Sequence, residues 1–319
     1  MNLGKNDFQD SYIDQNSGCL RNLLGIKDSE ELSRLETALV LNRCYELELA
    51  SFDSSDRVVD KTFDFDHLKG IHKHLFQDVY EWAGQARHVD ISKGETRFLP
   101  HSLIERGAYT VFSELKDQNY LKGLEPGDFS KYAGYYLGEI NHIHPFREGN
   151  GRTQREFINQ LAHHNDYYIE WKNITQKQMV EASIEADRGN IKPMAVLIHE
   201  NLADRDIVLF IKQNRSFDGE HAKLFSAEAG KKYDGTIIGV TERHVMQASI
   251  DSPNHVIIHD RHSLSRMPDM NKRVEISYPH GDIGLVREPE KLKERDLSKT
   301  QILNLEKRSH QHEEHEWER

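Results

Sequence analysis

Hydrophobic residues recur at three- and four-residue spacing through the first two thirds of the chain. The pattern is clearest in SEELSRLETALVLNRCYELEL (29–49), HLKGIHKHLFQDVYEWA (67–83) and DFSKYAGYYLGEINHI (128–143). Because apolar residues at this spacing share one face of an α-helix, each segment is predicted to be an amphipathic helix. The pattern therefore predicts an all-α domain over residues 1–213.

Polar residues at the starts of these segments supply candidate helix caps. Asp28 or Ser29 begins the first helix, with Glu31 in its first turn, and Asp128 begins the helix that runs to His142. Their side-chain oxygens can accept hydrogen bonds from the free amides of the first turn. We expect helices to start at these positions.

One segment, RHVDISKGETRFLP (87–100), interrupts the helical pattern. Its residues alternate in character around Lys93 and Gly94, and Pro100 closes the segment. This arrangement is typical of a short β-hairpin. We expect an exposed flap at this point of the helical domain.

After residue 213 the period of the pattern changes to two. A polar, turn-rich run (213–220) precedes TIIGVTERHVMQASI, NHVIIHDRH, KRVEISYP and DIGLVRE, which all lie within residues 218–288. Alternation predicts strands, and four or five short strands favour a small closed or partly open barrel over a flat sheet with exposed edges. The charged residues 289–319 are expected to form a helical or disordered tail.

Length and composition narrow the class of protein. The chain has 319 residues, enough for two domains. Its mean hydropathy of −0.74 and lack of a long apolar run exclude a membrane span, so we expect no membrane partner. The start of the chain has no secretory signal, which predicts folding in the cytoplasm. Two cysteines, Cys19 and Cys44, exclude a disulfide framework, and a net charge of −11 argues against a nucleic-acid partner.

The candidate chemistry lies in HPFREGNGRTQR, residues 144–155. Pro145 disfavours helical backbone at His144, so the preceding helix should end there and leave the imidazole in a loop. Gly149 and Gly151 lack a Cβ, and the apolar run FINQLA after them predicts a new helix. The amides at the start of that helix can bind phosphate.

Charged residues of the same segment suit a nucleotide. Arg152 and Arg155 are three residues apart on the new helix, hence on one face, and each offers forked donors to phosphate oxygens. Glu148 can hold Mg²⁺, which commonly takes one or two carboxylates together with substrate phosphates. Phe146 is expected to anchor the loop in the core. We expect His142 to be structural, because two histidines at spacing two do not share a helix face.

The segment HPFREGNGRTQR matches the Fic family signature HPFx(D/E)GNGRxxR at every defined position, and the chain therefore resembles Fic proteins. DVYEWAGQAR (78–87) is similar to the family's stretch leading into its flap, so the resemblance covers roughly residues 30–210. It implies a protein adenylyltransferase, which transfers AMP from ATP onto a Ser, Thr or Tyr hydroxyl of another protein.

The resemblance also implies a role for each motif residue. His144 would be the general base that takes the proton of the target hydroxyl, a role that its ordinary pKa of about 6.5 suits. Glu148 would bind the Mg²⁺ that bridges the α and β phosphates. The phosphates themselves would be bound by Gly149, Asn150, Gly151, Arg152 and Arg155.

In Fic proteins the flap docks an extended segment of the target by main-chain hydrogen bonds, a mode that adds a strand to a sheet edge. The matching residues here are Ser92, Lys93, Gly94, Glu95, Thr96, Arg97 and Phe98. Charges at 93, 95 and 97 could select a partner, and they are equally typical of a solvated hairpin tip.

A Fic domain followed by a small β-barrel resembles the Bartonella effector proteins, which append an OB-like unit and then a BID secretion domain. This resemblance implies a type IV secreted effector that acts in the host cell cytoplasm, with a host small GTPase as one candidate target. The chain stops before a BID domain, so a truncated chain and a naturally short relative both stay open.

Control is inferred from a missing pattern. Many Fic proteins carry an inhibitory helix, Ser/Thr-x-x-x-Glu-Gly/Asn, whose Glu pairs with the second motif Arg. Here only Glu148 and Glu200 precede Gly or Asn, and the residues four places earlier are His144 and Val196. We expect a small antitoxin-like protein to supply a Glu to Arg155 in trans.

Two other functions stay open on the sequence. One is a Fic enzyme that uses another nucleotide or acts as a kinase, although the intact Arg155 favours AMP transfer. The other is a binding module, because OB-like units often hold nucleic acid or peptides. Few Lys and Arg occur within residues 235–288, which argues against a groove for a nucleic-acid strand.

Overall fold

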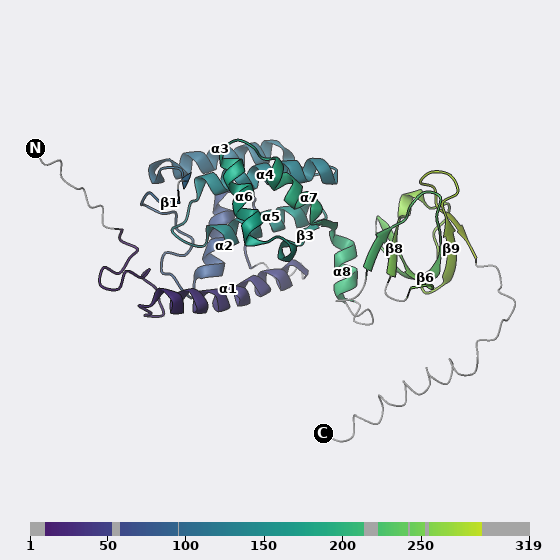
Figure 1. Cartoon of the computed structure of the whole chain (residues 1–319), viewed down its shortest axis with the longest axis horizontal. Coiled ribbons are helices and arrows are strands. Elements are labelled where there is room, and N and C mark those ends of the chain that lie inside the picture. Colours follow the sequence, from purple (N-terminus) through teal and green to yellow (C-terminus); the bar gives the residue numbers. More distant parts are fainter. Residues whose placement is uncertain are drawn as a thin grey trace, which may run out of the picture. The chain divides into compact units, whose positions relative to one another are not determined.

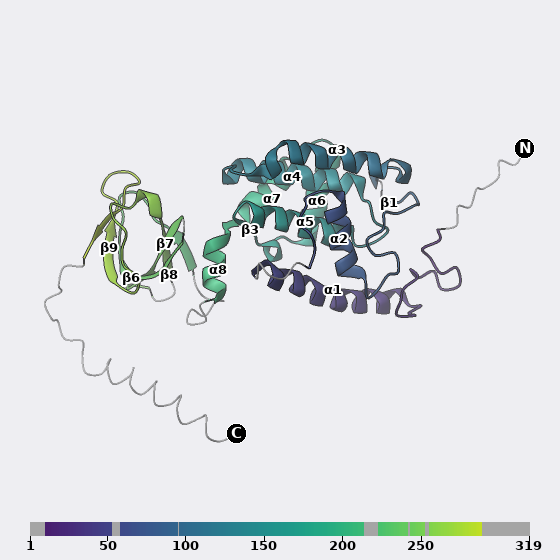
Figure 2. The same cartoon turned by 180° about the vertical axis from the view of Figure 1, so that it is seen from behind.

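The computed structural model divides the chain into two compact units, Met1–Val208 and Leu209–Arg319 (Figures 1 and 2). It describes residues 10–52, 58–94, 96–213, 223–241, 243–252 and 255–288, without the side chains of 51–52 and 210–213. The expected tail, 289–319, and the flap residue Glu95 lie outside these ranges. The division between the units falls within α8 (Arg205–Gln213).

The first unit is helical, as the pattern predicted. α5 packs against α2 and α4, and its Phe157, Ile158 and Leu161 are fully buried. Of the described helices, none is long and apolar enough to span a membrane. The helices before α8 are α1 (Ser29–Phe52), α2 (Phe65–Phe76), α3 (Ile104–Asp117), α4 (Pro126–Ile143), α5 (Asn150–His164), α6 (Gln176–Asp187) and α7 (Lys192–Glu200).

The helix boundaries test the expected caps. Asp28 does cap α1, since its carboxylate accepts a hydrogen bond from the Glu31 amide at 2.7 Å. Asp128 does not cap α4: the helix starts two residues earlier, at Pro126, and Asp128 lies in its first turn. Proline favours this start because its fixed φ suits the first helical position and its missing N–H costs nothing there.

α2 is shorter than its apolar pattern predicted. It ends at Phe76, and the chain then continues in turns. Val79 and Tyr80 are nevertheless buried, at 0% and 2% exposure. The spacing of apolar residues in 77–83 therefore indicates which side chains are buried, although this segment is not helical.

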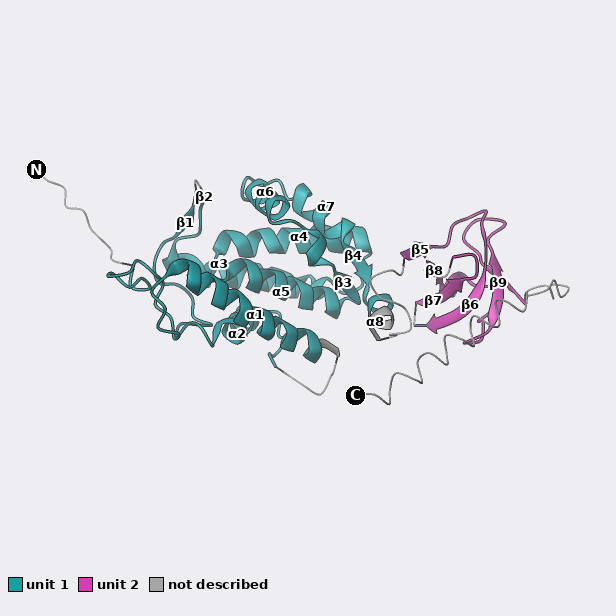
Figure 3. Cartoon of the chain, turned by 60° about the horizontal axis from the view of Figure 1, so that its bottom comes forward, with its two compact units in different colours: residues 1–208 teal, residues 209–319 magenta. Residues whose placement is uncertain are grey.

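The predicted flap is present. β1 (Ser92–Lys93) and β2 (Thr96–Arg97) pair antiparallel, with Ser92 opposite Arg97. Gly94 turns the chain with φ of 60°, in the left-handed region that glycine adopts without strain. Figure 3 shows the hairpin standing out from the helices of the first unit.

The second unit is a mixed six-stranded sheet, so of the two expected forms, a closed or a partly open barrel, the closed one is not found among the described residues. The strand order is β10-β9-β6-β7-β8-β5, with β5 parallel to β8 and the other pairs antiparallel. β5 and β10 are not paired with each other among the described residues, whereas a closed barrel requires its edges to pair. The strands are β5 (Lys223–Ser226), β6 (Lys232–Val240), β7 (His244–Ser249), β8 (His255–Asp260), β9 (Arg273–Ser277) and β10 (Leu285–Arg287).

Both cysteines are free thiols. Cys19 is buried in the core of the first unit. Cys44 lies on α1, and burial raises the pKa of its thiol to about 11. No disulfide contributes to the stability of the chain, as the composition predicted.

Candidate active site

His144 follows the last residue of α4 directly, as the proline after it predicted. Its backbone is left-handed, with φ of 46° and ψ of 60°, and its amide still donates to the carbonyl of Ile140. Its Nδ1 lies 3.1 Å from the carbonyl oxygen of Asn141. Because a carbonyl only accepts, Nδ1 carries the proton in this contact, and Nε2 of the neutral ring is left as an acceptor.

Burial lowers the pKa of His144 to about 4. The hydrogen bond to Asn141 opposes the shift, and the positive charges of Arg87 and Lys93 add to it. The ring is therefore neutral at physiological pH, with a lower pKa than the ordinary value used in the sequence analysis.

We expect His144 in the free protein to stay neutral from about pH 8 to about pH 5. A lowered pKa means that the ring takes up a proton only as the pH falls through about 4. The measurement is the NMR shift of the imidazole Cε1–H against pH, assigned with the His144→Asn variant. A midpoint near 6.5, the value of an unperturbed histidine, would contradict the buried geometry.

Phe98 covers the imidazole of His144. The two ring centroids lie 3.6 Å apart with an interplanar angle of 13°, so the rings are stacked. From the sequence, Phe98 was expected only as part of the flap. The structure adds a direct contact between the flap and the ring of His144.

The turn between α4 and α5 is braced from within. The side chain of Asn150 accepts from the Phe146 amide at 2.9 Å and donates to the Phe146 carbonyl at 2.7 Å. Phe146 is 1% exposed and stacks on His72, which confirms that it anchors the loop. Gly149 has φ of 83°, and a Cβ there would lie 2.3 Å from the Phe76 ring. Glycine at this position is required by both backbone and packing.

The two arginines of the motif have different surroundings. Arg152 pairs with the buried carboxylate of Glu36 on α1, and its Nη2 lies 3.5 Å from Oε1 of Glu148. Arg155 lines the cavity instead, and in the described part of the chain it forms no ion pair. Burial, then the nearby charge of Arg152, lower the pKa of Arg155. Although both side chains leave the same region of α5, only Arg155 is poised for an anion in the cavity.

Glu36 was missed by sequence reasoning. It also accepts a hydrogen bond from the hydroxyl of Tyr80, so a single carboxylate joins α1, the segment after α2, and α5. Its position 116 residues before Arg152 carries no local signal.

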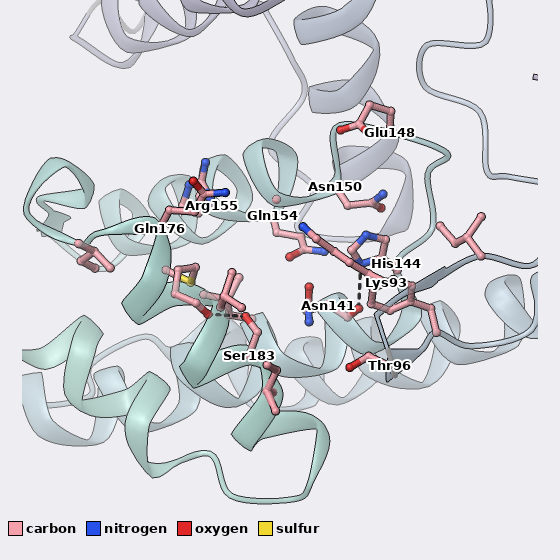
Figure 4. Close-up of a pocket in the computed structure, with 18 of the residues that line it drawn as sticks. Lys93, Thr96, Asn141, His144, Glu148, Asn150, Gln154, Arg155, Gln176 and Ser183 are labelled. Carbon is pink, nitrogen blue, oxygen red and sulfur yellow. Dashed lines mark hydrogen bonds between the residues drawn. The ribbon is translucent and has the colours of Figure 1, made fainter. Parts of the chain in front are cut away.

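His144, Glu148 and Arg155 line one cavity of about 870 Å³ (Figure 4). Flap residues line one side, the motif residues line the floor, and the segment 171–184 lines the remaining wall. Sequence reasoning missed that wall, which includes Trp171, Thr175, Gln176, Met179, Val180 and Ser183. Its sequence, WKNITQKQMVEASI, only indicates an amphipathic helix.

Glu148 could supply one carboxylate ligand of a metal site. Its side chain is 46% exposed and lines the cavity, and its Oε1 accepts from the Gly149 amide at 2.9 Å. No group of three or more potential metal ligands occurs among the described residues. His142 does not line the cavity, and its Nδ1 lies 3.0 Å from Asp187. One carboxylate beside a phosphate-binding turn is the pattern typical of Mg²⁺ held together with a nucleotide.

Comparison with known families finds a match within each unit. The profile of the Fic/DOC family matches residues 62–162. The profile of the KfrB domain matches residues 232–287, in place of the OB-like unit that we expected.

Curated relatives match the first unit. Protein adenylyltransferase VbhT of Bartonella schoenbuchensis is 46% identical over 195 residues, which cover 61% of this chain and 39% of VbhT. The probable protein adenylyltransferase y4lH of Sinorhizobium fredii is 38% identical, over 60% of this chain and 96% of y4lH. This chain thus spans well under half the length of VbhT but nearly the whole of y4lH.

A solved structure also resembles this chain. It is BepC, a VirB-translocated effector protein of Bartonella tribocorum, determined with bound AMPPNP. The TM-score is 0.53 at 27% identity, over 60% of this chain and 96% of BepC.

Proposed function

The chain belongs to the Fic/DOC family, and we propose on this premise that it transfers AMP from ATP to a Ser, Thr or Tyr hydroxyl of a target protein. One observation carries the proposal: a neutral His144 and a half-buried Arg155, in the second turn of α5, line the same cavity. A base and an anion-binding group in one cavity suit attack on a bound phosphate.

The proposed reaction balances as follows. The hydroxyl oxygen of the target attacks the α phosphorus, and its proton passes to Nε2 of His144. A bond forms between that oxygen and phosphorus, while the bond from phosphorus to the bridging oxygen breaks and pyrophosphate leaves. His144 then releases its proton to solvent. Most of the rate enhancement would come from alignment and charge stabilisation.

The phosphates would lie over the start of α5. The amides of Asn150 and Gly151, in the first turn of α5, favour an anion. The Gly149 amide, which donates to Oε1 of Glu148, would join them once that carboxylate turns to the ion. Arg155 would bind the outer phosphates, since no acid occupies its guanidinium among the described residues. Arg152 would contribute mainly by holding Glu148 and Glu36 in place.

Glu148 would hold the magnesium ion together with phosphate oxygens. The bound ion would neutralise the charge of the phosphates. This assignment is supported by the exposure of Glu148 to the cavity and by its position directly before the anion-binding turn.

The wall from 171 to 184 would receive the base and ribose. Trp171, Met179 and Val180 offer apolar surface, whereas Gln176 and Ser183 offer hydrogen-bonding groups. A few polar groups on an apolar wall are typical of sites for small ligands.

The flap would bind the target. Ser92, Lys93 and Thr96 line the cavity beside His144, so a strand added along the flap would bring its hydroxyl to the base. Lys93 and Arg97 give the flap positive charge, which suits an acidic segment next to the modified residue. A host small GTPase is one candidate target. The effector named in the comparison is translocated, and we extend this to host-cell action for this chain.

The experiment uses two forms of labelled ATP. The full chain is incubated with Mg²⁺, a pool of candidate target proteins and ATP labelled at either the α or the γ phosphate. Label from the α position should enter protein, and mass spectrometry should find AMP on a hydroxyl residue. Entry of γ label alone would indicate a kinase and overturn the proposal, and omission of Mg²⁺ should abolish the signal.

Inhibition would come from a separate protein. A partner helix carrying a Glu would pair with Arg155 and exclude the outer phosphates. α1 offers an exposed apolar stripe for such a helix, with Leu41, Tyr45 and Leu49 at 63%, 60% and 49% exposure and four residues apart.

We expect the chain purified alone to modify itself or its target. Candidate small helical partners should suppress this activity, and variants of those partners without the Glu should not. Glu36→Gln is the matched internal test, because Glu36 is a buried carboxylate on a motif arginine. A chain that is inactive alone and gains activity from Glu36→Gln would show that the inhibitor is internal.

A further inference from the structure

Arg87 lies where the chain enters the flap, and its side chain is fully buried. Buried cations are normally paired with a carboxylate. The nearest one, Asp90, is 3.9 Å from Nη1 and accepts instead from the amide and the ring of His101. Other groups therefore accept the hydrogen bonds of the charged Arg87 side chain.

Those groups are backbone carbonyls from both sides of the active site. Nε donates to the carbonyl of His144 at 2.8 Å, and Nη2 donates to that of Ile143 at 3.2 Å. Nη1 donates to Val89 at 2.7 Å, and Nη2 also donates to Leu99 at 2.5 Å. One planar group thus ties the two legs of the flap to the end of α4.

Two further contacts close the same unit. The amide of Arg87 donates to the carbonyl of Pro145 at 2.8 Å, and the amide of Leu99 donates to the carbonyl of His142 at 3.0 Å. Phe98, which lies between β2 and Leu99, stacks on the ring of His144. His144 is consequently held by its carbonyl, through Arg87, and by its ring, through the flap.

This bracing matters because the backbone of His144 is left-handed, a region that costs a non-glycine residue about 1 kcal/mol or more. Such a conformation persists only where the surroundings determine it. The backbone conformation of His144 determines the direction of its imidazole. It thereby also determines the distance from Nε2 to the target hydroxyl.

We propose that Arg87 is a positioning residue, which sets the orientation of His144 and the position of the flap as one rigid unit. The inference rests on the proposed function for its catalytic consequence, although the structural unit itself does not depend on that function. Arg87 touches neither the cavity nor any phosphate-binding residue, so its effect on the reaction passes through His144 and Phe98.

The test compares Arg87→Lys with Arg106→Met, which removes an exposed arginine from α3. Arg87→Lys keeps the charge, but an ammonium cannot span four carbonyls in one plane. It should lower kcat for AMP transfer about 100-fold, the loss expected from a displacement of about 1 Å, with the KM for ATP within about threefold. KM for the target should rise, and Arg106→Met should behave as wild type.

A readout without activity separates this inference from the proposed function. In Arg87→Lys, hydrogen exchange of the amides of residues 89–99 should accelerate, and the NMR shift of the His144 ring should move away from its ring-stacked value. If the protein proves not to transfer AMP, these two measurements still decide the structural claim. Wild-type exchange, ring shift and kcat would overturn it, as would a lower melting temperature with all three unchanged.

Phe98→Leu keeps Arg87 and its bonds and removes only the stacking. It should lower kcat about tenfold and leave the KM for ATP unchanged, since apolar bulk without a flat ring holds the imidazole less well. Wild-type kcat in this variant would overturn the coupling between flap and base, even if Arg87→Lys failed to fold.

Discussion

We expect His144→Asn to abolish AMP transfer, with a loss on the order of 100- to 10,000-fold in kcat, because loss of a general base alone costs this much. Asparagine tolerates the left-handed backbone of this position better than alanine does, so the fold should be retained. His144→Ala should show the same loss with a small additional cost in stability. Transfer of α-labelled AMP is the measurement.

The neighbouring histidine gives the control. His142 lies two residues earlier, in the last turn of α4, but it pairs with Asp187 and does not line the cavity. His142→Ala should keep wild-type kcat, and all three variants should bind ATP with unchanged affinity by calorimetry. Wild-type transfer by His144→Asn would remove His144 from the reaction, while equal losses in both histidine variants would point to a structural cause.

The second large effect is expected at Arg155. Arg155→Ala should lower kcat/KM for ATP on the order of 10- to 100-fold, the range expected for a lost charge-assisted hydrogen bond. Arg155→Lys should recover only part of the rate, because an ammonium cannot make the two-pronged contact. Initial rates over a series of ATP concentrations measure both values. Equal rates for lysine and arginine would show that charge alone matters there.

Stability should separate Arg155 from Arg152. Burial already disfavours the charge of Arg155, so Arg155→Ala should leave the melting temperature unchanged or raise it. Arg152→Ala leaves the buried carboxylate of Glu36 without its cation and should cost about 1–3 kcal/mol of unfolding free energy. Urea denaturation of both variants without nucleotide measures the difference. A larger loss at Arg155 would contradict the assigned pairing.

Local features were the ones that the sequence could predict. The end of α4 at His144, the start of α5 after Gly149 and the hairpin around Gly94 each depend on a few consecutive residues with restricted backbones. Proline and glycine act through φ and ψ directly, and such effects need no knowledge of the rest of the chain.

Features that depend on distant segments were missed. The pairing of Arg152 with Glu36, the wall around Met179 and the stacking of Phe98 on His144 each join separate parts of the chain. The spacing of Arg152 and Arg155 predicts that they lie near one another. It does not predict which groups each of them contacts. That is decided by α1, which packs on α2 and brings a carboxylate to one arginine only.

The error in the length of α2 and the undecided closure of the barrel have a common cause. Apolar spacing in 77–83 and alternation in 232–288 both report which residues are buried. They do not specify where a helix stops or whether the two edges of a sheet meet. Among the described strands, β5 lies at an edge of the sheet and pairs parallel to β8. This pairing joins distant segments of the chain, so the alternation of residues does not predict it.

The state of the two thiols makes the protein convenient for spectroscopy. The thiolate is the form that alkylating reagents attack, and Cys44 with a pKa of about 11 contains very little of it at neutral pH. Cys19 is buried without exposed surface. A cysteine introduced at Thr96, on the flap, should therefore be labelled selectively by a fluorophore without removal of either native residue. Binding of nucleotide or target beside the flap could then be followed in real time in an otherwise unaltered chain.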